Sequence, residues 1–229
     1  MTNKIHFYGL LHLDSTQNSA TNVSVDDFSH QIDIYRRNAL TLARTLAIQN
    51  IPYTLLTNRP DLIKDGNAEL DVKEIPFETK VPNGIKFYSA HFKIDAFRYF
   101  SGIKGEYSIL CDLDVVCINK FPNALRNLVK SKTPICYDIS DQVIPAYGHE
   151  TIIRDLECVI GSASEGRWYG GEFIGGTDEF FSKLYSTALE LMPSYLENLS
   201  KSHHVGDEAI VSPSIELLRK QFYIADGGT

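Results

Sequence analysis

The sequence has no excess of positive charge and no long apolar run. Its 229 residues include 22 Lys or Arg and 29 Asp or Glu, for a formal net charge of −7. Because nucleic acids and anionic membranes attract basic surfaces, this balance argues against nucleic acid as a partner. No run approaches the ~20 apolar residues that a transmembrane helix needs. The first apolar run, residues 5–13, is broken by two histidines and does not read as a signal peptide. We therefore expect a cytoplasmic protein without a transmembrane segment, and peripheral contact with the inner face of the membrane stays open.

Cysteine is scarce, and no pair has the C-x-x-C spacing of a zinc or dithiol site. Of the four cysteines, Cys111, Cys117 and Cys136 lie in apolar, strand-like runs. Buried cysteines in such runs act as small apolar residues. We expect them to be reduced, which is typical of a reducing compartment.

Strand-like runs alternate with segments of helical periodicity. We predict strands at 5–11, 53–57, 72–76, 107–111, 134–137 and 221–225, with 115–118 extended, and helices at 29–49, 89–105, 177–199 and 207–220. Such alternation predicts βαβ units, and hence one Rossmann-like α/β domain over residues 1–229, with a mostly parallel central sheet flanked by helices. Ligands of such sheets bind outside the carboxyl ends of the strands, where the strand order reverses.

An apolar strand delivers two acids to its carboxyl end, Asp112 and Asp114. In an extended segment, residues i and i+2 point the same way, so both carboxylates can face one site. Two close carboxylates repel each other and are costly to bury without a cation. Hard oxygen ligands suit Mn²⁺ or Mg²⁺, which also bind substrate phosphates. The pair therefore predicts a metal site, although a solvated acidic turn would show the same pattern.

This strand with its D-x-D motif, preceded by a helix that carries Lys93, resembles the nucleotide-sugar-dependent glycosyltransferases of the GT-A fold. In those families the first acid lies near the ribose of the nucleotide, and the second binds the metal that bridges the two phosphates. The resemblance implies these roles for Asp112 and Asp114. It also implies a nucleotide-binding half over about residues 1–120 and a sugar- and acceptor-binding half over about 121–229.

The second half is similar to the retaining α-galactosyl and N-acetylgalactosaminyl transferases related to the blood-group enzymes. Residues 168–176 (WYGGEFIGG) look like the aromatic and glycine-rich segment that lines the sugar site, with Glu172 making it one residue longer. Residues 203–209 (HHVGDEA) look like the family's H-D-E segment. The resemblance implies that Glu208 is the nucleophile and that Asp207 contacts the donor sugar. Acids at the start of a helix are also favoured by the helix dipole, which is the plainer explanation for both.

Further contacts to the nucleotide sugar are expected from residues near strand ends and glycines. These candidates are Tyr8, Gly9, Asn58, Lys93, Gly170 and Gly171. For Lys93, an exposed helical lysine is an equal alternative, and for the glycines, tight packing within a strand.

The sequence thus predicts a metal-dependent glycosyltransferase. It would move a hexose, with retention, from a nucleotide diphosphate sugar, most simply UDP-linked, to a glycan or glycolipid acceptor. An aspartate-nucleophile phosphohydrolase also places D-x-D after a strand, but residues 206–211 (GDEAIV) lack the last acid of its G-D-x-x-x-D pattern. An inactive carbohydrate-binding protein of the same fold is the other alternative.

Overall fold

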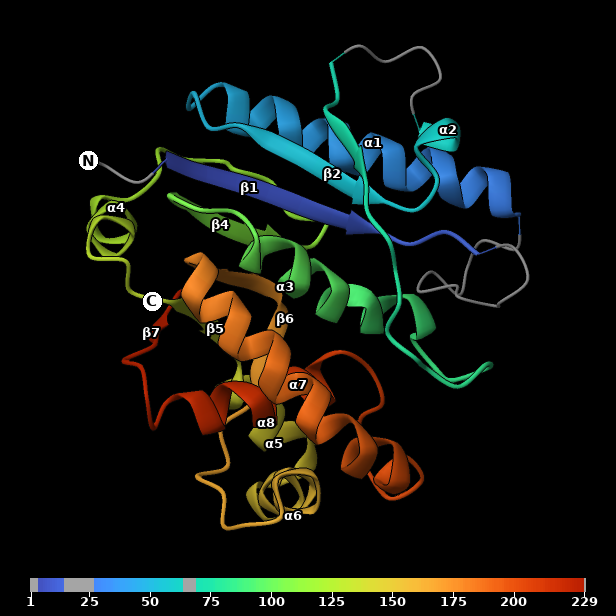
Figure 1. Ribbon diagram of the computed structural model, residues 1–229, viewed down its shortest axis with the longest axis vertical. Coiled ribbons are helices and arrows are strands. Elements are labelled where there is room, and N and C mark those ends of the chain that lie inside the picture. The colour runs from blue at the N-terminus through green and yellow to red at the C-terminus, as the bar shows by residue number, and fades with distance from the viewer. Residues whose placement is uncertain (1–3, 15–26, 64–68, 229) are drawn as a thin grey trace.

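A seven-stranded sheet runs through the computed structural model, which describes residues 4–14, 27–63 and 69–228 (Figure 1). The strand order is β3 (Val72–Glu74), β2 (Tyr53–Thr57), β1 (Lys4–Leu11), β4 (Glu106–Cys111), β6 (Tyr169–Gly176), β5 (Ile135–Asp138) and β7 (Ala225–Asp226). Only β6 runs against its neighbours, and the other strand pairs are parallel. The α/β fold with a mostly parallel sheet is therefore confirmed.

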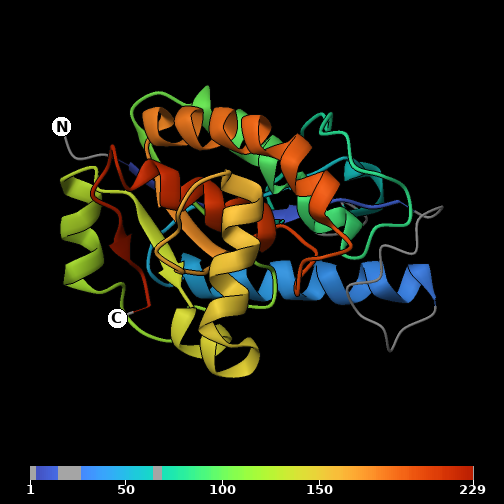
Figure 2. The same cartoon turned by 90° about the horizontal axis from the view of Figure 1, so that it is seen from below.

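Helices cover both faces of the sheet (Figure 2). One face carries α1 (Phe28–Ala47), and the other carries α3 (Lys93–Ser101), α7 (Asp178–Asn198) and α8 (Glu208–Leu218). The remaining helices are α2 (Pro60–Ile63), the 3₁₀ turn η1 (Tyr88–Phe92), α4 (Asn123–Lys130), α5 (Ser140–Tyr147) and α6 (His149–Ile160). None of the helices in the described part of the chain has the length and apolar character to cross a membrane.

Local sequence accounts for the elements that frame the site. In α1, the buried Ala39, Leu42 and Leu46 recur at helical spacing, and Asp27 caps its first turn by accepting a hydrogen bond from the Ser29 N–H at 2.9 Å. The last five residues of β4 are all buried, because helices pack on both sides of this central strand. The strand therefore brings its carboxyl end, and with it Asp112, to a fixed place.

Several predicted elements need correction. Ser89 does not cap a helix, since it lies within the turn η1 and α3 begins at Lys93. Residues 115–118, which were predicted only to be extended, belong to no strand of the sheet. The last strand is 225–226 rather than 221–225, because the N–H groups of Gln221 and Phe222 bond to the Leu218 carbonyl and extend the winding of α8. Helices α4, α5 and α6 were not predicted at all.

The strand order places the reversal between β1 and β4. From β1 the chain proceeds outward through β2 and β3, then returns to place β4 on the opposite side of β1. The carboxyl ends of β1 and β4 therefore diverge into separate connections, which leaves a crevice at this edge. The sheet draws its strands from both the 1–120 and the 121–229 halves of the chain.

Candidate active site

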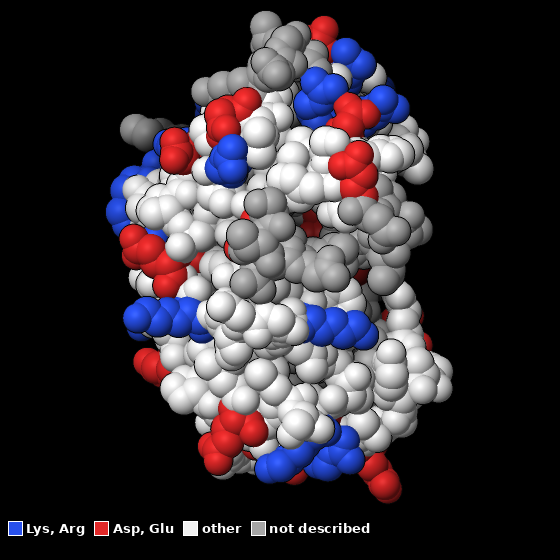
Figure 3. Space-filling model, turned by 90° about the vertical axis from the view of Figure 1, so that its right-hand side faces the viewer, with Lys and Arg blue, Asp and Glu red and all other residues white. Residues whose placement is uncertain are grey.

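A cavity of about 450 Å³ opens at the carboxyl ends of β1 and β4. Its wall includes residues 10–13 at the end of β1 and just beyond it, one side of α1, residues from 87–93 and the acids Asp112, Asp114 and Asp207. This volume lies within the usual range for small-molecule sites. Figure 3 shows the side of the molecule toward which β1 and β2 point, and the described Lys and Arg side chains on it are interspersed with Asp and Glu rather than gathered in one patch. The positive charge of the cavity therefore has to come from individual residues.

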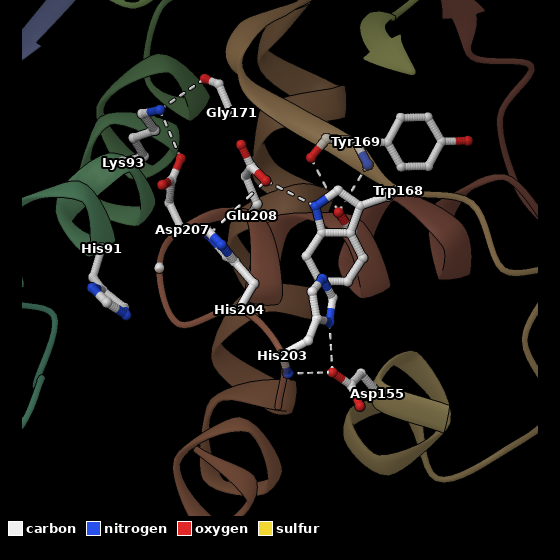
Figure 4. Close-up of polar contacts among 12 residues, drawn as sticks. His91, Lys93, Asp155, Trp168, Tyr169, Gly171, His203, His204, Asp207 and Glu208 are labelled. Atoms are coloured by element: carbon white, nitrogen blue, oxygen red, sulfur yellow. Dashed lines mark hydrogen bonds and ion pairs between the residues drawn. The ribbon is translucent and has the colours of Figure 1, made fainter. Parts of the chain in front are cut away.

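Lys93 supplies that charge from a buried position. Its ammonium lies 2.8 Å from Asp112 Oδ1 and 2.6 Å from Asp207 Oδ2, and it donates a hydrogen bond to the Gly171 carbonyl at 2.9 Å. Figure 4 shows the contacts to Asp207 and Gly171. Burial alone would lower the pKa of Lys93, but the two carboxylates raise it above its ordinary value, so the side chain stays charged. The expectation of an exposed helical lysine is wrong, since this side chain is only 8% exposed.

A bulge in β6 brings Gly171 to the ion cluster. Cys136 of β5 pairs with Ile174, while the next residue, Tyr137, pairs with Gly170, so residues 171–173 are extra on β6. The Glu172 carbonyl within the bulge accepts a hydrogen bond from the Asp112 N–H at 3.1 Å. Such bulges redirect groups at strand ends. A Cβ atom on Gly171 would lie 1.9 Å from Asp207 Oδ2, so only glycine allows this approach.

Glu208 lies beside the cluster at the start of α8. Its Oε2 accepts a hydrogen bond from Trp168 Nε1 at 2.8 Å and lies 4.0 Å from His204 Nε2. Burial, together with the charges of Asp207 and Glu172, raises the pKa of Glu208 to about 7 against the donor from Trp168. The cavity wall includes Asp207 but not Glu208. Because its pKa is about 7, the Glu208 carboxyl group can exchange a proton near neutral pH.

Glu172 is a further acid near the ion cluster that sequence reasoning did not assign, although it does not line the cavity. Burial raises the pKa of its carboxyl group, and the charges of Asp112 and Asp207 add to the effect. A Cβ atom on Gly170 would lie 2.0 Å from Glu172 Oε2, so Gly170 makes room for this side chain. The available signal was its position, because it is the residue that lengthens the glycine segment relative to the family pattern.

Buried contacts fix the loop that precedes α8. The Tyr195 hydroxyl lies 2.6 Å from His91 Nε2 and accepts a hydrogen bond from the Gly206 N–H at 3.2 Å. Both side chains are fully buried. Asp207 and Glu208 therefore start their helix from a backbone that is anchored to η1 and α7.

The two acids of the D-x-D motif both line the cavity, as expected. The extended geometry assumed for them is wrong, because Leu113 and Asp114 form a turn after β4 and Leu113 lines the same cavity. Asp112 keeps a second oxygen beyond the one that contacts Lys93, and Asp114 is exposed. Among the described residues, no group of three or more His, Cys, Asp and Glu side chains forms a ready-made metal site. The pair fits Mn²⁺ or Mg²⁺ as a partial set of hard oxygen ligands, which such ions commonly complete with phosphate and water.

Three predicted contacts lie outside the ion cluster. Tyr8 is buried and donates a hydrogen bond at 2.7 Å to Glu106, at the far end of β4 from Asp112. A Cβ atom on Gly9 would lie 2.2 Å from the Tyr53 hydroxyl, so its glycine serves packing. Asn58 bonds through its side-chain amide to both the N–H and the carbonyl of Leu13 at 2.9 Å. It thereby holds a segment that lines the cavity, without lining the cavity itself.

Comparison with models of known protein families and with curated proteins gave no match. A functional proposal for this chain therefore has to come from the geometry of the site and from the resemblance of its motifs.

Proposed function

We propose that this protein is a metal-dependent glycosyltransferase that moves a hexose from a nucleotide diphosphate sugar, most simply UDP-linked, to a glycan or glycolipid acceptor. The observation that carries the proposal is the convergence of Lys93, Asp112 and Asp207 at one cavity, with Asp114 in its wall. These residues come from α3, the end of β4 and the start of α8. They meet where open α/β sheets bind their ligands.

Asp112 and Asp114 would hold Mn²⁺ or Mg²⁺ together with the diphosphate, and the ion would stabilise the charge of the leaving nucleotide. Lys93 is a fixed cation at the same cavity, and its three N–H donors already contact Asp112, Asp207 and the Gly171 carbonyl. It would therefore hold the acids in place and add a preorganised positive charge near a phosphate, without binding the phosphate directly. Asp207, held in place by Lys93, presents a carboxylate beside it that can accept hydrogen bonds from sugar hydroxyls.

Glu208 is the candidate for the group that faces the reacting carbon. In its ionised form it could stabilise an oxocarbenium-like transition state or attack the sugar, as the resemblance to retaining transferases implies. With a pKa of about 7, a large share of Glu208 is protonated at neutral pH. We therefore expect the rate of transfer to rise with pH through this region, as Glu208 ionises. Retention of configuration, a cytoplasmic location and peripheral membrane contact remain predictions.

Calorimetric titration of UDP, GDP and CDP, each with and without Mn²⁺, tests the proposal. We expect one nucleotide to bind and its affinity to depend on Mn²⁺. Asp114→Asn should weaken Mn²⁺-dependent nucleotide binding at least tenfold. The control is Asp178→Asn at the start of α7, where the side chain pairs with Lys104, and it should bind nucleotide like the wild type. If none of the nucleotides binds with Mn²⁺ present, the proposal fails. Turnover of a generic aryl phosphate would then support the phosphohydrolase, and sugar binding without nucleotide binding would support the inactive carbohydrate-binding protein.

A further inference from the structure

Among the described residues, the Glu208 carboxylate has one strong hydrogen-bond donor, which does not line the cavity. Trp168, the only tryptophan of the chain, donates its indole N–H to Glu208 Oε2 at 2.8 Å. An indole N–H can only donate, so this contact favours the ionised carboxylate and cannot exchange a proton with it. Since the indole is 2% exposed, water cannot readily replace it.

Two hydrogen bonds fix the backbone of Trp168, which immediately precedes β6. Its N–H donates to Ser140 Oγ at 2.8 Å, and its carbonyl accepts from the Ile139 N–H at 2.9 Å. Ile139 directly follows β5, and Ser140 is the first residue of α5. The backbone of Trp168 is therefore held by the connection between β5 and α5, independently of Glu208.

A buried hydrogen-bonded pair supports the indole ring. The ring packs against His203, with ring centroids 4.8 Å apart. Asp155 Oδ2 accepts hydrogen bonds from the His203 backbone N–H at 2.7 Å and contacts its Nδ1 at 2.6 Å (Figure 4). The side chains of His203 and Asp155 are 7% and 5% exposed. Asp155 on α6 thus holds the imidazole against the indole.

We infer that Trp168 is a positioning residue for the Glu208 carboxyl group, and that the Asp155–His203 pair keeps its indole N–H directed at that group. The part that Glu208 plays in sugar transfer rests on the proposed function, whereas the dependence of Glu208 on Trp168 does not. Other charged or titratable groups also act on Glu208, namely Asp207, Glu172, Lys93 and His204. Any test must therefore separate the indole contact from these neighbours.

The direct test is a carboxyl-carbon NMR titration of ¹³C-glutamate-labelled protein, with Glu208→Gln assigning the Glu208 signal. Trp168→Phe keeps an aromatic ring but removes the donor. Because a hydrogen bond to a charged group favours the ionised form, the pKa of Glu208 should rise further by about one unit in this variant. Tyr169→Phe is the matched control, since it changes the adjacent residue and removes only a hydroxyl, which accepts a hydrogen bond from Arg219. A Glu208 titration that is unchanged in Trp168→Phe, or equally shifted in Tyr169→Phe, would overturn the inference.

A second measurement needs no change at Trp168. The fluorescence of this single tryptophan should show an inflection near pH 7 that is lost in Glu208→Gln. His203 and His204 also lie beside the ring, so an inflection that survives in Glu208→Gln belongs to them and counts against the inference. Asp155→Asn should shift the Glu208 titration in the same direction as Trp168→Phe, by a smaller amount. No shift there would remove the supporting role of the Asp155–His203 pair.

These outcomes are distinct from those of nucleotide binding. A Glu208 shift in Trp168→Phe without nucleotide binding would leave the positioning role standing and remove the transferase. Nucleotide binding with an unchanged Glu208 pKa in Trp168→Phe would support the transferase and rule out the positioning role of Trp168. If both hold, the Glu208-dependent limb of the transferase pH profile should move upward by about one unit in Trp168→Phe, which a merely structural role for Trp168 would not produce.

Discussion

Replacing Lys93 by methionine should reduce the free energy of unfolding by about 3 kcal/mol near pH 8. Methionine is similar in length but carries no charge, so two carboxylates would lose their shared cation. The Asp207 side chain is 12% exposed and would be left as a nearly buried, unpaired charge, whereas Asp112 is 39% exposed and keeps much of its hydration. Removing one partner of a buried pair costs about 3–5 kcal/mol, and the hydration of Asp112 places the expected value at the lower end.

Urea denaturation at pH 8 and pH 5 would measure this effect. Protonation of the unpaired acids relieves their repulsion, so the loss should be smaller at pH 5. A second change, Asp207→Asn, should restore at least half of the stability lost in Lys93→Met, because it removes the stranded charge. The reference variant is Lys104→Met, whose 78% exposed side chain pairs with Asp178 on the surface and should contribute no more than about 1 kcal/mol. If Lys93→Met loses no more than Lys104→Met at pH 8, the ion cluster does not have the energetic weight that we assign to it.

Two further changes test the surroundings of the cluster. Gly171→Ala should lose about 1–3 kcal/mol of stability and at least tenfold in nucleotide affinity, because its new Cβ would lie 1.9 Å from Asp207 Oδ2 and must displace the carboxylate. Gly102→Ala, where the nearest atom is 3.4 Å away, is the control, and equal effects in both variants would contradict the argument. Glu208→Gln tests the pH dependence of stability. Burial raises the pKa of Glu208 from 4.5 to about 7 in the folded protein. The group therefore stabilises the fold fully below pH 4.5, and this stability is lost as the pH rises to about 7. In Glu208→Gln, the free energy of unfolding should vary less between pH 4.5 and 7, and it should be up to about 3 kcal/mol higher at pH 8 than in the wild type. Urea denaturation from pH 4 to 8 measures this. An unchanged slope would show that Glu208 is not responsible.

The sequence was most informative where one element buries an unbroken apolar segment. Strand β2 coincides with the predicted 53–57, because all five of its residues are buried and Pro52 precedes them. Helix α1 lies within two residues of its predicted ends for a similar reason, since its apolar stripe is regular and Asp27 marks its start. These features depend on local spacing, which a single sequence displays directly.

Helices that bury little were harder to predict. Helix α5 buries none of its residues and contains Pro145, so it shows no clear apolar stripe. Helix α4 is short and buries only Val129, but its Leu125, Leu128 and Val129 lie on one face at helical spacing, so this helix could have been predicted. Helix α6 does carry a readable stripe of Ile152, Leu156 and Val159, interrupted by the buried Asp155. The apolar pattern was sufficient to predict α6, so leaving this helix out was an error.

The site shows a comparable division. The placement of Asp112 at the cavity follows from its position at a strand end, whereas Asp114 reaches the same cavity through a turn that the sequence did not predict. The burial of Lys93 does not follow from its own helix, because it depends on Asp207 and the Gly171 carbonyl, which a bulge and a distant loop bring into contact. Likewise, nothing local indicates that Trp168 meets Glu208. Contacts of this kind are properties of the packed structure, and the family resemblance pointed to the segments without pointing to the pairs.

The charge balance of the site explains why metal dependence is a sharper test than affinity. Lys93 already lies between Asp112 and Asp207, and Asp114, Glu172 and Glu208 add three more carboxyl groups nearby. One buried ammonium therefore cannot also neutralise a diphosphate, which would meet repulsion from the acids around it. A divalent ion at Asp112 and Asp114 would reverse the sign of that interaction. If the site binds nucleotide diphosphates, binding should be weak without Mn²⁺ and much tighter with it. Equal affinity in the two conditions would mean that the phosphates lie elsewhere, even if the nucleotide binds.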